Sequence, residues 1–534
     1  MVLTKEVFQN ISKENNNFVH KKYIFFIKSL LLNRKVYIIT LIFLSIIAFW
    51  AFKFVNKIFF PPSNRAQFII HFRLPEGSSI NATEEKLKIL EHFLKEKIEI
   101  ENFVAYIGEG GPRFYLSLSP EQDKENYAFV LVNCYSYDNV VSLIPKVREF
   151  LRENIPYCNA SVNMLETGAP VGDPIRIRIS GEDISELYVL SDKIKDLLYN
   201  IPGVLNIFDD WGKKIKKLII KINQEKAKRV NISSQDIAYS LKMQYDGEIV
   251  TNFREKDKNI PILIRSNKAA RKDIEKIEGL NVYSYTNNRS IPLSQLAKTE
   301  LNWVHSKIFR RNGLRTITVK CKLAQGFFVD KILKQLIPKI SEIQKSWPAG
   351  YKYEIGGENE ESDKAIKALL RQVPFSIFII IMVMVMQFNS IRKVVIIIFT
   401  IPMGLIGVTF GLLIAEMPFG FMAMIGIISL AGIVVNNAIV LIDKINIEIS
   451  KGIEQKKAVI LATLSRTRPI LLTSITTVGG LLPLAILGGD FWAPMAVTIM
   501  SGLIFSTILT LGFVPVLYSL FFKLTFFKQD FNNI

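Results

Sequence analysis

Two kinds of sequence alternate along this chain of 534 residues. Long apolar runs occur near the start and in the last third, whereas the middle mixes charged and apolar residues throughout. The run over residues 36–52 is interrupted only by Thr40 and Ser45, and with its flanking turns it reaches the roughly 20 residues that cross a bilayer. Five further runs cover residues 373–388, 394–415, 421–442, 470–489 and 495–522. The pattern predicts six membrane spans.

The stretch between the first two runs, residues 61–372, is charged throughout and has no comparable apolar run, which predicts a large aqueous domain. Lys and Arg are frequent in the leader, in the loop after the second span and in the predicted loop after the fourth span, residues 444–468. The predicted loops on the opposite side, residues 416–418 and 490–492, contain neither. The positive-inside rule therefore predicts two cytoplasmic termini and an outside domain. Apolar residues at helical spacing over residues 21–34, with Lys on the other faces, predict an interfacial helix.

Strand and helix patterns recur in the aqueous domain. Strands are predicted at residues 67–74, 128–132, 175–179, 205–209, 315–322 and 352–355, and helices at residues 82–98, 140–153, 185–200 and 329–345. Their order predicts two-layer βαβ units with mixed sheets. A less regular insert, residues 213–301, interrupts the second unit and is predicted to form a small α+β subdomain.

Composition narrows the class of protein. The chain has 49% hydrophobic and 22% charged residues and a net charge of +19, which fits a basic membrane protein better than a soluble globule or a disordered tail. Its three cysteines lack zinc-site spacing, and its four histidines are scattered. The glycines of residues 108–111 lack the Lys and Ser or Thr of a phosphate loop. We therefore expect no enzyme, no metal or cofactor site and no nucleic-acid partner.

Several motifs resemble those of a known transporter family. Residues 59–62 (FFPP) and 74–79 (LPEGSS) look like an exit from a span into an aqueous domain. Residues 432–443 (GIVVNNAIVLID) look like the centre of a later span, and residues 466–474 (RTRPILLTS) like the start of the next. In this order, over residues 36–522, they resemble the C-terminal half of a resistance-nodulation-division (RND) multidrug efflux permease of the acriflavine-resistance, hydrophobe-amphiphile type.

The resemblance implies the fold class: an α-helical membrane protein with six spans and a large periplasmic α+β domain of βαβ (ferredoxin-like) porter subdomains, half of an RND transporter. The implied domains are a cytoplasmic leader with an interfacial helix (1–35), a first span (36–58), a first porter subdomain (59–170), a second porter subdomain (171–212 and 302–358), an inserted docking or funnel subdomain (213–301), a five-span bundle (359–522) and a cytoplasmic tail (523–534).

The resemblance also implies a function. The chain would be the C-terminal half of a proton-driven pump in the bacterial inner membrane, exporting drugs or other amphiphiles from the periplasm or the membrane. It would need a separate N-terminal half, assemble as a trimer, and work with a periplasmic adaptor and an outer-membrane channel. No cofactor is expected, because the proton gradient supplies the energy.

The predicted spans three to six contain no Asp, Glu, Lys, Arg or His between their ends, and Asn cannot carry a proton. Asn436 stands where some family members have a Lys of the proton relay, with Asn437 beside it. The alternative role for both is interhelical hydrogen bonding. Arg466 and Thr473 match family residues along the water path to the relay. The alternatives are a positive-inside anchor for Arg466 and a bond to its own helix for Thr473.

The glycine-rich loop over residues 108–111 has aromatic neighbours, Tyr106, Phe114 and Tyr115. Aromatic faces accept many ligand shapes, so these residues are predicted to bind substrate, with ordinary core packing as the alternative. Three other functions stay open at this stage: a half-size homo-oligomeric exporter related to RND proteins, a non-transporting scaffold or decayed fragment of a pump, and an ATP-driven permease.

Overall fold

The computed structural model describes residues 18–168, 171–265, 277, 279–284, 288–324 and 326–527, with backbone alone for residues 18–23. The chain forms two compact units, one of Met1–Asp210 with Phe309–Ile534 and one of Trp211–Ile308. Residues 1–17 of the predicted leader and 528–534 of the predicted tail lie outside the described residues.

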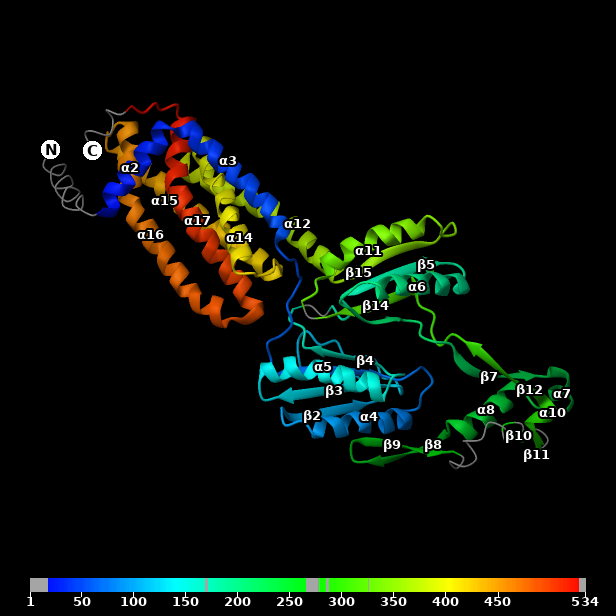
Figure 1. The fold of residues 1–534 in the computed structure, drawn as a ribbon. Coiled ribbons are helices and arrows are strands. Elements are labelled where there is room, and N and C mark those ends of the chain that lie inside the picture. The colour runs from blue at the N-terminus through cyan, green and yellow to red at the C-terminus, as the bar shows by residue number, and fades with distance from the viewer. Residues whose placement is uncertain are drawn as a thin grey trace. The chain divides into compact units, whose positions relative to one another are not determined.

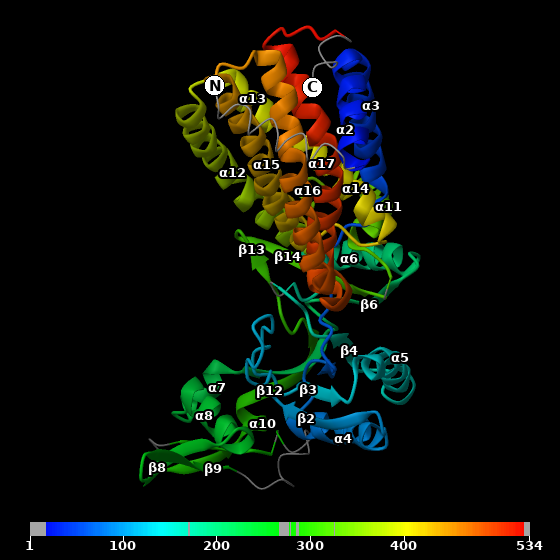
Figure 2. The same ribbon diagram turned by 90° about the vertical axis from the view of Figure 1, so that its left-hand side faces the viewer.

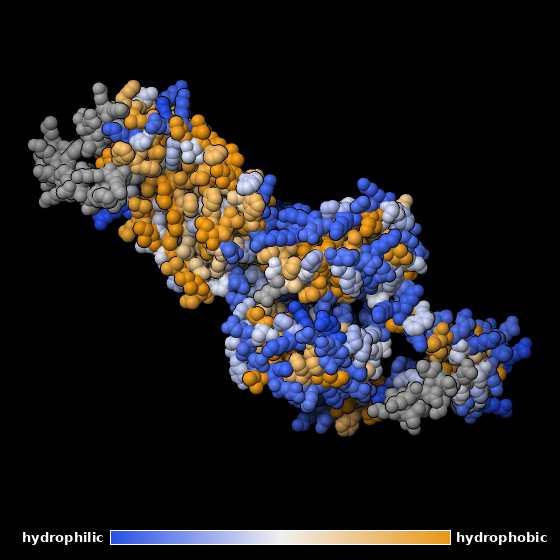
Figure 3. Space-filling model, in the orientation of Figure 1, coloured by the Kyte–Doolittle hydropathy of each residue, from blue (hydrophilic) through white to orange (hydrophobic). Residues whose placement is uncertain are grey.

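The described residues of the first unit include six helices that are long and apolar enough to cross a membrane. They are Arg34–Phe54, which joins α3 (Arg34–Ala51) to the 3-10 helix η1 (Phe52–Phe54); α12 (Glu358–Phe388); Ile391–Ile414, made of α13 (Ile391–Ile398) and α14 (Ile401–Ile414); α15 (Phe421–Ser450); α16 (Gln455–Leu487); and α17 (Gly489–Phe521). Figure 1 shows them gathered in one bundle with the shorter α2 (Phe18–Leu32). The bundle's surface is largely apolar in Figure 3, as lipid-facing helices require.

Two predicted loops are wrong in their bounds. α15 continues to Ser450 and α16 begins at Gln455, so Arg466 lies within a helix rather than in the loop after the fourth span. Residues 490–492 likewise belong to the first turn of α17. The apolar run marks only the part of a helix that contacts lipid. The helices extend beyond it because buried side chains such as Ile445 and Ala458 continue the helical spacing.

α17 lies at the centre of the bundle, because α14, α15 and α16 all pack against it (Figures 1 and 2). Glycine permits the close approach of α14. A Cβ atom on Gly407 would lie 2.5 Å from the carbonyl oxygen of Ser501 and 2.9 Å from the Cα atom of Gly502, both on α17. Small residues of this kind let membrane helices pack backbone to backbone.

The first aqueous subdomain is a βαββαβ unit. Its elements are β1 (Gln67–Arg73), α4 (Ile80–Lys95), β2 (Ile100–Ile107), β3 (Tyr127–Cys134), α5 (Tyr137–Asn154) and β4 (Asn159–Met164), with the strands in the order β2-β3-β1-β4. Phe68, Ile70 and Phe72 alternate along β1 and are buried with Leu87 and Leu90 of α4. Alternation thus gives one face of the sheet to the helices, whereas residues such as Ile69 and Phe129 on the other face are buried in a second cluster with Leu118 and Leu165.

The second aqueous subdomain repeats this plan. Its elements are β5 (Ile175–Gly181), α6 (Ile184–Tyr199), β6 (Val204–Asp209), β13 (Arg310–Arg311), β14 (Leu314–Leu323), α11 (Val329–Gln344) and β15 (Lys352–Gly357), with the strands in the order β13-β14-β5-β15 and β6 also paired with β14. Ile177, Ile179 and Val319 are fully buried beneath its helices.

The predicted mixed sheets are wrong, because every strand pairing in both subdomains is antiparallel. Each strand-helix-strand crossover joins parallel strands, but it skips one position in the sheet. β3 lies between β1 and β2, and β14 lies between β5 and β6. Since the intervening strand runs in the opposite direction, all neighbours are antiparallel.

The second unit, Trp211–Ile308, is a separate α+β body. Its described elements are β7 (Ile215–Ile222), α7 (Gln224–Arg229), α8 (Ser234–Tyr245), β8 (Glu248–Glu255), β9 (Lys258–Ile264), β10 (Asn281–Ser284), β11 (Arg289–Pro292), α10 (Leu293–Leu296) and β12 (Ala297–Val304). They form three two-stranded sheets, β7 with β12, β8 with β9 and β10 with β11. Its core contains Ile232, Ile237, Val282, Leu293 and Leu296.

The face of the first sheet that is turned away from its helices carries a polar cluster. Nδ1 of His71 lies 2.7 Å from the hydroxyl of Tyr127, and burial together with the positive charge of Arg73 lowers the pKa of His71 to about 3. Burial opposes ionisation of Glu121 as well, but the charges of Arg73 and Lys124 lower the pKa of its carboxyl to about 2. The folded chain thus holds His71 neutral beside an ionised carboxylate.

This cluster predicts an acid-sensitive subdomain. Between pH 6.5 and 3, His71 is protonated in the unfolded chain and neutral in the folded chain. The free energy of unfolding therefore falls as the pH falls, by at most about 1.4 kcal/mol per pH unit. The window from pH 6.5 to 5 isolates this effect from the protonation of carboxylates. Over that window, the melting temperature of His71→Gln should depend much less on pH than that of the parent chain. The control His92→Gln, which changes an exposed residue of α4, should keep the parent's pH dependence. An equal slope in both variants contradicts the assignment.

Candidate functional site

A cavity of about 840 Å³ lies in the first unit, where both βαββαβ subdomains meet the ends of membrane helices. The first subdomain contributes α5 and the end of β4, and the second contributes the end of β14 and the start of α11. The segment after α3, the loop after α14 and the first turns of α12 and α17 complete the wall. Its volume falls within the range of small-molecule pockets.

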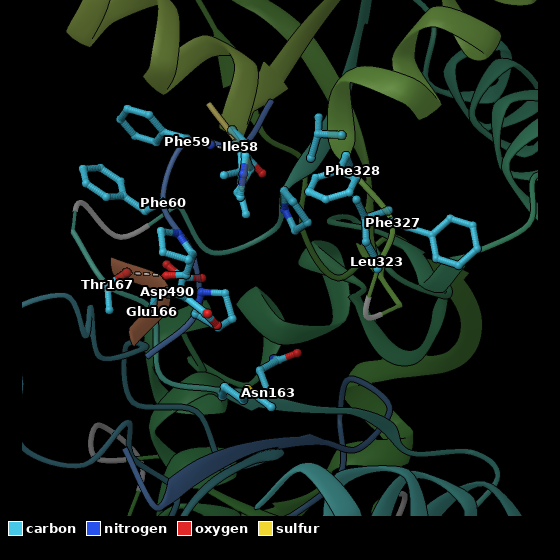
Figure 4. A pocket seen from close by; sticks show the side chains of 18 of the residues that line it. Ile58, Phe59, Phe60, Asn163, Glu166, Thr167, Leu323, Phe327, Phe328 and Asp490 are labelled. Carbon is cyan, nitrogen blue, oxygen red and sulfur yellow. Dashed lines mark hydrogen bonds between the residues drawn. The ribbon is translucent and has the colours of Figure 1, made fainter. Parts of the chain in front are cut away.

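Aromatic side chains cover opposite walls of the cavity. Phe59 and Phe60 follow α3 on one side, and Phe327 and Phe328 precede α11 on the other (Figure 4). The ring of Phe60 lies 5.2 Å from that of Phe421 at the start of α15, centroid to centroid. The membrane helix ends therefore hold the apolar wall in place.

Carboxylates also line the cavity, namely Glu166, Glu358, Glu416 and Asp490. Oε1 of Glu358 accepts a hydrogen bond from the backbone N–H of Phe59 at 2.6 Å, and Oε2 of Glu166 accepts one from that of Val171 at 2.8 Å. Glu416 and Asp490, beside the membrane helix ends, are exposed.

The two basic residues of the wall are bound to protein oxygens. Nη2 of Arg148 donates to the carbonyl of Val162 at 2.6 Å, and Nζ of Lys322 lies 3.6 Å from Oδ1 of Asp173. The exposed charge on the wall is therefore mostly negative, which favours cations in the cavity.

The predicted substrate-binding aromatics lie elsewhere. Tyr106 and Tyr115 pack against a buried cluster that includes Tyr127 and Phe129, and the ring of Phe114 lies 6.5 Å from that of Phe129, centroid to centroid. None of the three lines the cavity just described. Tyr106 and Tyr115 thus have the core-packing environment named as the alternative, and their substrate role stays a prediction.

The two asparagines of α15 differ in exposure. Asn436 is exposed on the bundle surface, and Asn437, about 100° further round the helix, is half-buried. Gly432 lies one turn before Asn436, and a Cβ atom there would meet no atom within 4 Å. A role for either asparagine in a proton path stays a prediction.

Arg466 and Thr473 lie two turns apart on α16 and so occupy the same helix face. Nε of Arg466 is buried and has no hydrogen-bond partner among the described residues. Thr473 is exposed, and its hydroxyl donates to the carbonyl of Ile470 at 2.9 Å, within its own helix. Their place on a water path also stays a prediction.

Sequence reasoning missed the cavity residues. The FFPP run of residues 59–62 was interpreted only as a family motif. The sequence did offer one signal for them, because acidic and aromatic residues lie next to several predicted span ends.

Within the described ranges, no group of three or more His, Cys, Asp or Glu side chains is arranged to hold a metal ion.

A family model for the AcrB/AcrD/AcrF family matches residues 3–522. The chain belongs to this family of RND permeases. The cobalt-zinc-cadmium resistance protein CzcA of Cupriavidus metallidurans is 27% identical over 485 residues, which are 86% of this chain and 45% of CzcA. The swarming motility protein SwrC of Bacillus subtilis is 26% identical over 467 residues, which are 84% of this chain and 42% of SwrC. The chain therefore spans about half the length of these relatives.

A solved crystal structure of a heavy metal efflux pump has the same fold, with a TM-score of 0.76 and 21% identity, covering 94% of this chain and 51% of the pump. The predicted RND resemblance is confirmed by the family match. The multidrug and acriflavine part of the prediction is not supported, because CzcA and the nickel and cobalt resistance protein CnrA are metal-resistance proteins.

Proposed function

We propose that this chain is the C-terminal half of an RND efflux transporter of the bacterial inner membrane, and that its cavity takes up divalent metal cations for export. The observation that carries the proposal is the cavity of about 840 Å³ with exposed carboxylates where aqueous subdomains meet membrane helices. The names of CzcA and CnrA support a metal substrate. Carboxylate oxygens, with Met164 and Met417 also on the wall, offer ligands for such ions.

The proposed assembly contains a second chain. The similarity covers about half of CzcA, and no titratable side chain lies in the middle of predicted spans three to six, so a proton-coupled pump needs an N-terminal half that carries a titratable group. The complete pump would be a trimer that meets a periplasmic adaptor and an outer-membrane channel and draws on the proton gradient. The large aqueous domain would lie in the periplasm and both termini in the cytoplasm.

A second candidate substrate is an amphiphilic drug. The aromatic walls formed by Phe59, Phe60, Phe327 and Phe328 favour it, since aromatic faces bind apolar molecules of many shapes. The two substrate classes depend on different parts of the wall, and variants can therefore separate them.

Binding to the purified full chain tests the substrate class. Calorimetric titration with Zn²⁺, Co²⁺ or Cd²⁺ should show affinity that falls at least about tenfold in Glu166→Gln/Asp490→Asn, because each lost charge removes on the order of 1 kcal/mol of attraction. The control Glu85→Gln/Glu182→Gln changes exposed acids outside the cavity. Unchanged metal affinity in the cavity variant, with ethidium binding lost in Ala324→Trp, would favour the drug instead.

Transport is tested in cells that lack their own RND pumps. The chain is expressed alone and with a six-span N-terminal half, and cellular zinc, cobalt and cadmium are measured by mass spectrometry. We expect lower metal content only when both halves are present. Full efflux from the lone chain would favour a homo-oligomeric exporter, and no efflux from either culture would favour a scaffold or fragment.

A further inference from the structure

A basic surface lies at the end of the membrane bundle remote from the cavity. The first turn of α17 lines the cavity, and because the helix has 33 residues and is about 50 Å long, its last turn lies at the opposite end of the bundle. That far end adjoins α2 and the start of α16. We call the exposed residues of α2, of the first turns of α3 and α16, and of residues 520–527 the α2 surface.

α2 is held there by one apolar face. Ile27 and Leu31, one turn apart, are buried in a cluster with Ile460 of α16 and Val516 of α17. The chain after α17 is fixed beside it, because Nη1 of Arg34 donates to the carbonyl of Leu524 at 2.6 Å. The α2 surface is thus part of the folded bundle rather than a loose tail.

The exposed part of the α2 surface is cationic. Lys35, Lys457 and Lys523 are exposed on three different segments of it. The sequences of α2, α3, α16 and residues 509–527 contain no Asp or Glu. Glu454, the exposed residue directly before α16, offsets only part of this charge. A net positive field attracts anions within about a Debye length, about 8 Å at physiological ionic strength.

An apolar side chain is also exposed on the α2 surface. Phe25 of α2 is 76% exposed, on the side of the helix opposite Ile27. An exposed Phe costs free energy in water but is stabilised where headgroups meet acyl chains. A surface with exposed cations and an exposed aromatic ring, at one end of membrane helices, fits the boundary of a lipid leaflet.

We propose that the α2 surface binds the headgroups of anionic phospholipids in the adjacent leaflet. The phosphates would pair with Lys35, Lys457 and Lys523, and Phe25 would enter the acyl boundary. Charge complementarity selects an anionic lipid over a zwitterionic one. The inference does not depend on the transported substrate, because none of these residues lines the cavity.

Native mass spectrometry of the full chain tests the proposal by titration with phosphatidylglycerol, cardiolipin or phosphatidylcholine. We expect the two anionic lipids to bind more tightly than phosphatidylcholine, and more weakly as salt is raised. In Lys35→Gln/Lys457→Gln/Lys523→Gln, their affinity should fall by about a hundredfold, since each lysine near a headgroup contributes about 1 kcal/mol. Inorganic phosphate at millimolar concentration should not compete.

The matched control is Lys339→Gln/Lys345→Gln/Lys352→Gln, which removes the same charge from exposed positions of the second βαββαβ subdomain. It should bind lipid as the parent chain does. Equal losses in both triple variants, or equal affinity for all three lipids, overturn the proposal. If the first triple variant aggregates, Lys457→Gln alone should still lose about fivefold. Displacement of lipid by an acidic peptide but no preference among lipids would identify a protein partner and also overturn it.

Discussion

Gly407→Ala is expected to lower the free energy of unfolding of the membrane bundle by about 3 kcal/mol. The added Cβ atom would lie 2.5 Å from the carbonyl oxygen of Ser501 and 2.9 Å from the Cα atom of Gly502. Both are backbone atoms of α17, so no rotation of a side chain relieves the overlap. α14 must move away from α17, and the buried contacts around Val408 and Leu412 are loosened. Steric-trapping or thermal unfolding measurements in detergent check this result.

Gly432→Ala is the matched control for this change. It adds the same atom to α15, where nothing lies within 4 Å. Since Ala is the better helix former, its stability should be unchanged or slightly higher. Equal destabilisation by both substitutions would show that the effect comes from the helix backbone and not from the contact between α14 and α17. If Gly432→Ala weakens only the complex with an N-terminal half, that face of α15 is its docking side.

Arg178→Leu is expected to cost about 3 kcal/mol of stability. Nη2 of Arg178 on β5 lies 2.7 Å from Oε2 of Glu360, in the first turn of α12, and the two side chains are only 12% and 19% exposed. The pair joins the second βαββαβ subdomain to a membrane helix. Removing the guanidinium leaves the Glu360 carboxylate poorly solvated, with Lys364 at 3.0 Å as its nearest remaining cation.

Arg152→Leu makes the same substitution in an exposed pair with Glu149 on α5, where the side chains are 77% and 63% exposed. Exposed pairs contribute about 0–1 kcal/mol, so this control should unfold nearly as the parent does. Thermal unfolding of the detergent-solubilised chain compares the two. A loss for Arg178→Leu no larger than for Arg152→Leu would mean that the contact between β5 and α12 does not support the fold.

Strong local patterns predicted many of the elements well. The start of the strand at Ile175 and the start of the helix at Val329 agree with the structure to the residue. β2 and β4 were not predicted, because their burial is irregular and their sequences, IENFVAYI and NASVNM, lack clean alternation. The pairing of strands in the sheets could not be predicted from local sequence pattern either, since the position of β3 between β1 and β2 depends on contacts between strands that are distant in sequence.

The candidate site was predicted less well than the fold. Tyr106 and Tyr115, two of the three aromatics chosen around residues 108–111, pack against a buried cluster of the first subdomain. A glycine-rich loop with aromatic neighbours looks the same in sequence whether it faces a cavity or a core. The cavity residues were not chosen. Their side chains come from segments as far apart as Ile58 and Pro494, and nothing in any one segment indicates the others.

The sequence by itself determined which segments can enter a membrane, because crossing a bilayer requires about 20 apolar residues in a row and this property is local. It also determined the family, because several motifs that are weak individually occur together in the order typical of that family. Only the tertiary structure decided that α17 is the centre of the bundle, that both sheets are antiparallel, and that carboxylates and aromatic rings share one cavity. These features depend on which distant surfaces fit together, and close packing between elements decides that fit.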